Sequence, residues 1–584
     1  MRRIIALFLC CLVALSAAAK ITLPPQIGDN MVLQQNTKAN LWGWANPGET
    51  VTVSSTWDDE VYTVKAGSDG AWKVAVYTPQ GSYEDHTVVI SAGKETVELK
   101  HVLIGEVWLA SGQSNMEMPL RGFDGCPVEG ALQEIATSGR YKGRIRFVML
   151  PKTEAYEPQT LINAPWKESC ADNAAEFSAT AWFFAKNLNE VLDVPVGIIC
   201  NACGGSAVEG WIPREIVRNY SDLVSEPEDV KKIRNQMARP TIMYYGQWCP
   251  VRNYTYKGAI WYQGESNIGH PDYALRMGDM IQVWREESGI SELPVYQVEI
   301  APYISGGGVD GLESALLREQ QRIAARDVEN CWCVSTVDLM YPYEGTQIHP
   351  ARKREVGERL SYMALNHTYG KKQFPGIAPT YDYYDVEGSN IVISFENVRQ
   401  AGGFNRSEGL EGFEVCGPDL VWHPATARVQ PFVNRVVVHS DDVPEPVAAR
   451  YCFKNWQLGN LAGANGLAVE PFRTDRIPEG EIPGITKEPD GDFEGHWTGS
   501  TRMEQMGGRE IQYDYRISKR ADGTWQCSVN SEAPQNVNVR GRRLTGLTAG
   551  GGMPFPLELK LKEDGTLSVQ MMGNETAVLS RRKK

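Results

Sequence analysis

The sequence has little that would hold it in a membrane. A helix needs roughly 20 apolar residues to cross a bilayer, and the apolar run near the start, from Ile4 to Leu15, has only 12. Two arginines precede this run and small residues at 17–19 follow it, which is the pattern of a secretory signal peptide. We therefore expect no membrane span, removal of residues 1–19, and a periplasmic or secreted mature protein.

The chain also lacks an excess of basic residues, with 58 Lys and Arg against 72 Asp and Glu. Loss of the signal segment removes two arginines and leaves 56 basic and 72 acidic side chains, a net charge of −16. Such a balance argues against nucleic acid or an anionic membrane as partner. Hydrophobic residues make up 42% and charged residues 22%, which excludes a mainly disordered or fibrous chain.

Cysteines are too few for a disulfide scaffold, since 10 of the 12 remain after residue 19. Two pairings stay open from the sequence: Cys416 with Cys452, and Cys126 with Cys170. The short motifs at 200–203 and 331–333 have no matching ligand pair, so buried thiols are favoured over metal binding. Because no metal-ligand cluster and no phosphate-cradling loop is evident, we expect neither a metal nor a cofactor.

Heptad repeats and low-complexity tracts are absent as well, so the 584 residues must form several cores, each under about 250 to 300 residues. Turn residues at 46–48 and 69–70, with alternating apolar residues after the second turn, indicate β-structure in the N-terminal region. Near the end of the chain, a connector rich in proline and glycine indicates a boundary between two units. The predicted units are an N-terminal β-sandwich (20–102), an α/β domain (103–372), a jelly-roll-like β-sandwich (373–480), a linker (481–492) and a small antiparallel β-domain (493–584).

Apolar strands alternate with amphipathic helices in the α/β region, which predicts a mainly parallel sheet. Strands are expected at 106–110, 196–200, 259–262 and 331–337, and helices at 181–192, 271–289 and from Pro350 onward. Ser178 is a candidate cap for the first helix, and Gly289 a terminator for the second. In open α/β sheets the active site forms at the carboxyl ends of the strands.

Glycine turns follow the first two strands. Ser114 lies in Gly-Gln-Ser-Asn-Met at 112–116, where a tight turn presents its hydroxyl and leaves its N–H free for an oxyanion. Gly204 and Gly205 follow the next strand and allow close backbone approach to a ligand. Taken singly, a helix cap and a simple turn are the stronger interpretations of the two motifs.

Polar side chains follow the other two strands. After the third come Gln263, whose amide can donate to an oxyanion, and Glu265, which we favour as part of a structural network. After the fourth, His349 precedes Pro350, a residue favoured at the first helical position. At or beside that N-cap the helix dipole would keep the imidazole neutral and able to accept a proton, although a plain capping histidine is the competing interpretation.

Together these motifs resemble the sialate O-acetylesterase family of SGNH-type hydrolases. The similarity rests on the nucleophile block at 112–116 and on further blocks around it: 204–206 with Glu209 and Trp211, 261–267, 317–319 with Gln321, 348–350 with Lys353 and 356–357, 31–34 with 42–44, and 471–475. It covers about 20–476 and implies a flavodoxin-like three-layer α/β catalytic domain flanked by all-β domains.

The resemblance implies Ser114 as nucleophile and His349 as general base. It also implies an oxyanion hole made by the N–H groups of Ser114 and Gly205 and the side chain of Gln263. The reaction would be acyl transfer that releases acetate from a sugar.

One position departs from the family pattern, because many SGNH hydrolases carry Asp three residues before the histidine and this chain has Thr346. We therefore expect a Ser/His dyad. The group that orients His349 stays open among a backbone carbonyl and three side chains of the preceding loop, with Glu265 and Asn267 as possible supporting residues. The three side chains are Gln347, Asp338 and Glu344.

The expected partner is an acetylated sugar, and the substrate that the resemblance favours is 9-O-acetylated sialic acid. Gln113, Arg121 and Trp211 are the candidate substrate contacts, with Arg121 either facing the sialate carboxylate or lying in solvent. An acetyl esterase for plant polysaccharide such as xylan and a non-catalytic glycan-binding protein are the alternatives. The sequence carries no sign of an oligomeric state.

Overall fold

The computed structural model describes residues 20–430, 433–475 and 491–582, apart from short gaps at 504–508, 521–523, 531–532, 541, 551–552, 563 and 572–573. The predicted signal segment and residues 481–490 of the predicted linker lie outside this range. Within it, no helix is both long and apolar enough to span a membrane. The ten cysteines are free thiols, so neither open disulfide pairing forms.

A parallel sheet lies at the centre of the α/β region, in the order β13-β12-β11-β7-β10-β8, with the short antiparallel β9 at its edge. The strands of this sheet are β7 (Glu95–Gly112), β8 (Ile145–Met149), β9 (Lys167–Glu168), β10 (Val196–Cys200), β11 (Gly258–Tyr262), β12 (Val295–Val298) and β13 (Cys331–Val334). Every residue of β10 and β11 is buried. That is why these strands consist of apolar and small residues, as expected for parallel strands covered on both faces.

The order of the strands differs from the flavodoxin-like 2-1-3-4-5 expectation. Counted along the chain, the parallel strands run 6-5-4-1-3-2, because β8 lies outside β10. The connection from β10 to β11 passes across β7, so the winding changes direction beside the end of β7. Ligands of open α/β sheets bind at such switch points.

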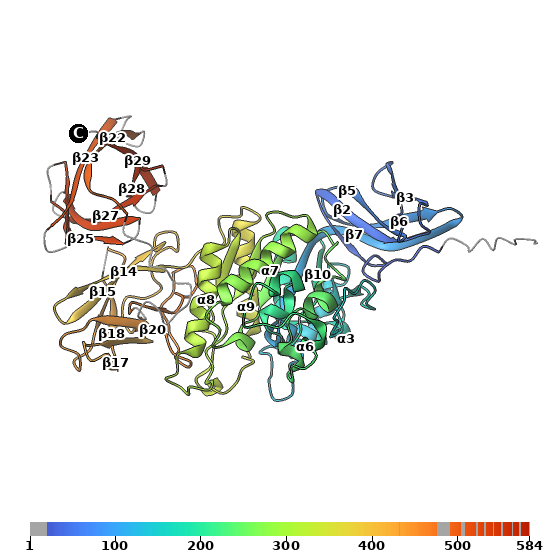
Figure 1. Ribbon diagram of the computed structural model, residues 1–584, viewed down its shortest axis with the longest axis horizontal. Coiled ribbons are helices and arrows are strands. Elements are labelled where there is room, and N and C mark those ends of the chain that lie inside the picture. Colours follow the sequence, from blue (N-terminus) through green and yellow to red (C-terminus); the bar gives the residue numbers. More distant parts are fainter. Residues whose placement is uncertain are drawn as a thin grey trace, which may run out of the picture.

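Helices cover both faces of the sheet (Figure 1). Val107 and Leu109 of β7 belong to the apolar core under α7 and α8, whereas Trp108 and Ala110 belong to the core under α4 and α9. The helices are α1 (Ser114–Glu117), α2 (Ala131–Thr137), α3 (Ala171–Ala175), α4 (Ala179–Leu192), α5 (Arg214–Val217), α6 (Pro227–Val230), α7 (Tyr273–Ser288), α8 (Glu313–Asp327) and α9 (Lys353–His367).

The local helix signals act as expected from the sequence. The Ser178 hydroxyl accepts a hydrogen bond from the N–H of Ala181 at 3.1 Å and caps α4. Gly289 ends α7 in the left-handed conformation, with φ of 71°. The sequence prediction missed β12 and α8, and β13 ends at Val334 rather than at 337.

The N-terminal strands share β7 with the central sheet. Over its first part this 18-residue strand pairs with β6 and β1, and over its last part with β10 and β11. The predicted boundary at 102–103 therefore falls inside a strand (Figure 1). The other strands of this region are β1 (Val32–Gln34), β2 (Thr37–Trp44), β3 (Thr50–Ser55), β4 (Val61–Lys65), β5 (Ala71–Thr78) and β6 (Ser82–Ala92).

Two further β-units follow the α/β region (Figure 1). The first packs two four-stranded antiparallel sheets around one apolar core: β14 (Thr380–Glu387), β15 (Asn390–Glu396), β19 (Arg435–His439) and β18 (Thr426–Gln430) against β17 (Trp422–Pro424), β16 (Phe413–Cys416), β20 (Ala448–Tyr451) and β21 (Phe472–Arg473).

The last unit is an eight-stranded antiparallel sheet in the order β24-β23-β22-β29-β28-β27-β26-β25, which curls round so that its edge strands β24 and β25 approach each other. Its strands are β22 (Gly495–Met503), β23 (Arg509–Lys519), β24 (Trp525–Val529), β25 (Gln535–Arg540), β26 (Arg543–Gly550), β27 (Met553–Leu561), β28 (Leu567–Met571) and β29 (Asn574–Arg581). Trp497 is fully buried in its core, where packing rather than ligand contact is its role.

Candidate active site

The turn that carries Ser114 depends on a glycine at the end of β7. Gly112 lies opposite Tyr262 of β11 with φ of +132°, and a Cβ there would lie 2.2 Å from the Tyr262 carbonyl oxygen. No residue with a side chain fits this position. The chain then turns into α1, so the partly exposed Ser114 emerges at the carboxyl edge of the sheet.

The structure brings Ser114 and His349 into hydrogen-bond contact although 235 positions separate them. The His349 Nε2 atom lies 2.8 Å from the Ser114 Oγ atom. The Phe123 ring packs edge-on against the imidazole, with centroids 5.3 Å apart. A hydroxyl and an imidazole at this distance have the geometry that proton transfer from a nucleophile to a general base requires.

The expected N-cap position of His349 is wrong, because α9 begins at Lys353 with Arg352 as its N-cap. The ring is nevertheless kept neutral, and the cause is its surroundings rather than a helix end. Burial of the imidazole, helped by the nearby charge of Lys353, lowers the pKa of His349 from 6.5 to about 4.

The Gly204–Gly205 loop lies directly against Ser114. A Cβ on Gly204 would lie 3.3 Å from the Ser114 Cβ atom. The Gly204 N–H donates to the Glu117 carboxylate at 2.6 Å, and Lys152 pairs with the same carboxylate at 2.9 Å. Gly205 has φ of +81°, and its N–H has no hydrogen-bond acceptor among the described residues. This leaves the Gly205 N–H available to a ligand.

Gln263 is not placed as an oxyanion donor, and that expectation needs correction. Its Nε2 donates to the Ser206 carbonyl at 3.1 Å and to the Asn267 Oδ1 at 2.7 Å, and its Oε1 accepts from the Tyr273 hydroxyl at 2.9 Å. Both amide hydrogens are therefore engaged in a fully buried network. Asn267 belongs to this network too, since it also accepts from the Val208 N–H and donates to Glu209.

A second network joins the neighbours of the two central residues. The buried Asn115 donates to Glu265 at 2.5 Å and to the Ile348 carbonyl at 3.1 Å, and accepts from Lys353 at 2.6 Å. Burial lowers the pKa of Lys353 to about 7 and raises that of Glu265. Glu265 thus holds the Asn115 side chain, and among the described residues it has no hydrogen bond to Ser114 or His349.

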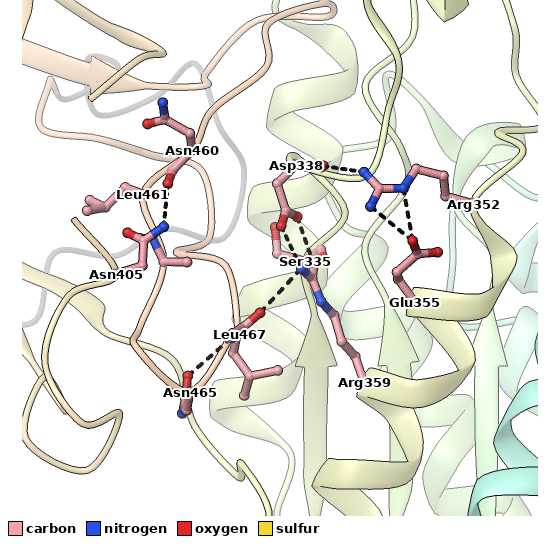
Figure 2. A network of polar contacts seen from close by, with 12 residues as sticks. Ser335, Asp338, Arg352, Glu355, Arg359, Asn405, Asn460, Leu461, Asn465 and Leu467 are labelled. Atoms are coloured by element: carbon pink, nitrogen blue, oxygen red, sulfur yellow. Dashed lines mark hydrogen bonds and ion pairs between the residues drawn. The ribbon is translucent and has the colours of Figure 1, made fainter. Parts of the chain in front are cut away.

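The carboxylates proposed to orient His349 are engaged elsewhere. Asp338 forms a two-pronged ion pair with Arg359, at 2.8 and 2.5 Å, and its carbonyl accepts from Arg352 (Figure 2). Glu344 accepts from the N–H groups of Tyr341 and Ala351. Gln347 does reach the histidine, but through the main chain, since its Oε1 accepts the His349 N–H at 3.3 Å.

The three speculative substrate contacts do not line the site in the expected way. Trp211 is completely buried and packs against Trp261 and Trp284. Arg121 is exposed and pairs with Glu176 at 2.7 Å. Gln113 is buried, and its Oε1 accepts from the N–H groups after β11, so it braces that loop.

Comparison with known proteins identifies the family. A family model described as carbohydrate esterase, sialic acid-specific acetylesterase, matches residues 104–366. A sialate O-acetylesterase of Pongo abelii is 30% identical over 477 residues, which cover 74% of this chain and 87% of the relative. The chain belongs to the sialate O-acetylesterase family.

The human sialate O-acetylesterase is 25% identical over 477 residues, covering 74% of this chain and 87% of that protein. The crystal structure of a carbohydrate acetylesterase from Xanthomonas citri superposes with a TM-score of 0.68 at 32% identity, covering 78% of this chain and all of that one. The chain is therefore a carboxylic ester hydrolase. Ser114 and His349 both lie within the matched region.

Four side chains of this esterase site were missed from the sequence: Glu117, Phe123, Cys126 and Lys152. Glu117 lies three residues after Ser114, a spacing that puts both on one side of a helical turn, so its proximity was foreseeable. Cys126, whose sulfur lies 3.8 Å from the His349 Nδ1, was considered only as a disulfide partner. Nothing local in the sequence signals that contact.

The Glu117 contact predicts a difference between two substitutions. Glu117→Ala removes the acceptor that holds the Gly204 N–H, and should lower kcat for p-nitrophenyl acetate about tenfold, the effect of one hydrogen bond to a charged group. Glu117→Gln loses the Lys152 ion pair equally but keeps an acceptor oxygen, and should stay within about threefold of the wild type. Equal kcat values for the two variants would show that the hydrogen bond does not position the loop.

Proposed function

We propose that this protein removes O-acetyl groups from sugars through an acyl-enzyme on Ser114, with His349 as general base. The observation that carries the proposal is the 2.8 Å contact between the Ser114 Oγ and the His349 Nε2 atoms. Support comes from membership of a carbohydrate esterase family whose matched region contains both residues.

In the first half of the reaction, the His349 Nε2 takes the hydroxyl proton while the Ser114 oxygen attacks the acetyl carbonyl. The oxyanion that forms is stabilised by the N–H groups of Ser114 and Gly205. When the carbon–oxygen bond to the sugar breaks, His349 returns its proton to the leaving sugar oxygen and Ser114 remains acetylated.

In the second half, His349 removes a proton from water, and the hydroxide oxygen attacks the acetyl-serine. The bond between the acetyl carbon and the Ser114 oxygen then breaks, the serine oxygen takes the proton from His349, and acetate leaves. The oxyanion hole of this mechanism contains two main-chain donors, because the amide of Gln263 is engaged within its buried network.

Removal of either member of the dyad should abolish turnover. Ser114→Ala and His349→Ala are each expected to lower kcat for p-nitrophenyl acetate by about 10⁴-fold or more, while circular dichroism and the melting temperature stay unchanged. His439→Ala, a change at the partly exposed end of β19, serves as control. A folded wild type without turnover would instead favour a glycan-binding protein.

The low pKa of His349 predicts activity that persists in acid. The base must be neutral, and its pKa is lowered rather than raised, so kcat/KM should hold as pH falls below 6.5 and reach half its plateau near pH 4. Lys353→Met removes a charge that opposes protonation of the ring and should move this midpoint to higher pH. Acetate release is the measurement, since p-nitrophenol is colourless in acid. A wild-type midpoint near 6.5 would contradict the proposed environment of the ring.

For the natural substrate we propose 9-O-acetylated sialic acid. A sialate carboxylate bound beside Ser114 needs a cation there, and the two candidates, Arg121 and Lys152, each pair with a carboxylate, Glu176 and Glu117 respectively. Lys152 fits, because its ammonium would lie 3.6 Å from a Cβ on Gly204 and its side chain is half exposed.

The substrate preference is measured by comparing acetate release from 9-O-acetyl-N-acetylneuraminic acid with acetate release from acetylated xylan. We expect kcat/KM for the sialate to exceed that for xylan by at least about tenfold, equivalent to one favourable charge contact. The opposite ranking would reassign the protein to plant polysaccharide.

A further inference from the structure

A thiol occupies the side of His349 that faces away from Ser114. The Cys126 Sγ atom lies 3.8 Å from the His349 Nδ1 and 3.3 Å from the Gln347 Oε1. In a Ser-His-Asp triad an acid fills this place. Among the described residues no carboxylate contacts the Nδ1 atom, since Asp338 and Glu344 have other partners.

The orientation of the Gln347 amide is fixed by its other two contacts. Its Nε2 donates to the Gly125 carbonyl at 3.2 Å, and its Oε1 accepts the main-chain N–H of His349 at 3.3 Å. Rotation of the amide by half a turn would set donor against donor at the His349 N–H. The atom that faces Cys126 is therefore an oxygen, and the thiol hydrogen points toward it.

This direction of the thiol hydrogen determines the imidazole tautomer. A sulfur whose hydrogen is donated to Gln347 presents lone pairs to the His349 Nδ1, so the Nδ1 must carry the proton. The Nε2 then has a free lone pair toward the Ser114 hydroxyl, as a general base requires. One chain of contacts thus runs from the Gln347 amide through the thiol and the imidazole to the nucleophile.

The sulfur is held in place by a closed turn. The N–H of Phe123 donates to the Cys126 carbonyl at 3.1 Å, and the N–H of Cys126 donates to the Phe123 carbonyl at 3.0 Å. The same turn supplies the Phe123 ring that packs against the imidazole edge. Both side chains that hold the ring from the far side therefore come from one four-residue segment.

We propose that Cys126, fixed by Gln347, is the positioning residue of the dyad and holds His349 in the Nδ1–H tautomer in place of the missing acid. The proposal rests on His349 being the general base of the proposed function. A thiol is a weak acceptor, so it selects the tautomer without stabilising the imidazolium as a carboxylate would.

Kinetics of Cys126 variants test the proposal on p-nitrophenyl acetate and by acetate release across pH. Cys126→Ala should lower kcat about tenfold with KM within twofold, the effect of losing one orienting contact. Cys126→Ser keeps a group that donates and accepts, and should recover most of the loss. Cys126→Asp should move the acid midpoint of kcat/KM up by at least about one pH unit, because a carboxylate favours the imidazolium. Cys170→Ala, at the exposed free thiol, is the control.

A spectroscopic readout separates positioning from folding and from turnover. In protein labelled with ¹⁵N-histidine, with the His349 signals assigned by their loss in His349→Ala, the wild type should show a protonated Nδ1 and a bare Nε2. Cys126→Ala should shift this balance toward the Nε2–H form, and Cys126→Ser should restore it.

Wild-type kcat and an unchanged tautomer in Cys126→Ala would overturn the proposal, as would equal losses in the Ala and Ser variants with the tautomer unaltered. A tautomer that depends on Cys126 in a protein without esterase turnover would leave the positioning role intact and refute the proposed function instead.

Discussion

Burial of the Asn115 amide is the constraint on which the geometry of this site depends. An amide without access to water must find its partners inside the protein, and Asn115 finds them on three separate segments: Glu265 after β11, the Ile348 carbonyl, and Lys353 at the start of α9. Asn115 adjoins Ser114, and Ile348 adjoins His349. The distance between Ser114 and His349 is therefore set by the residues beside them, through the hydrogen bond from the Asn115 side chain to the Ile348 carbonyl.

The parts of the fold that the sequence predicted are those with local causes. Strand β10 is a short apolar run that is buried on both faces, and α4 and α7 have a capping serine and a terminating glycine at their ends. Ser114 could be selected because a glycine turn precedes it, and His349 because the motifs occur together on strand ends. Strand β12 was missed, although the equally short β13 was predicted from the longer apolar run at 331–337.

Other features depend on partners that only the folded chain brings together. An amide such as Gln263 can turn its donors toward a ligand or toward protein, and Ser206, Asn267 and Tyr273 decide the matter here. The sequence predicted that His349 is neutral but gave the wrong cause. The burial of Lys353 beside the ring and the residue at which α9 begins both depend on the tertiary structure. In the proposed mechanism, the low pKa of His349 would also make its protonated form a stronger acid, which would help a sugar oxygen, a poor leaving group, to depart with a proton.

The long strand β7 gives the N-terminal region a mechanical role. Its 18 residues run from the sheet shared with β6 to the turn before Ser114, with an irregularity at His101, where φ is +58° and the pairing with β6 shifts register. Domains are commonly joined by flexible linkers that absorb relative motion, but a hydrogen-bonded strand is stiff along its axis. The N-terminal sheet and the turn before Ser114 therefore share one strand, and a chain shortened to begin at residue 103 would lose the half of that strand that pairs with β6.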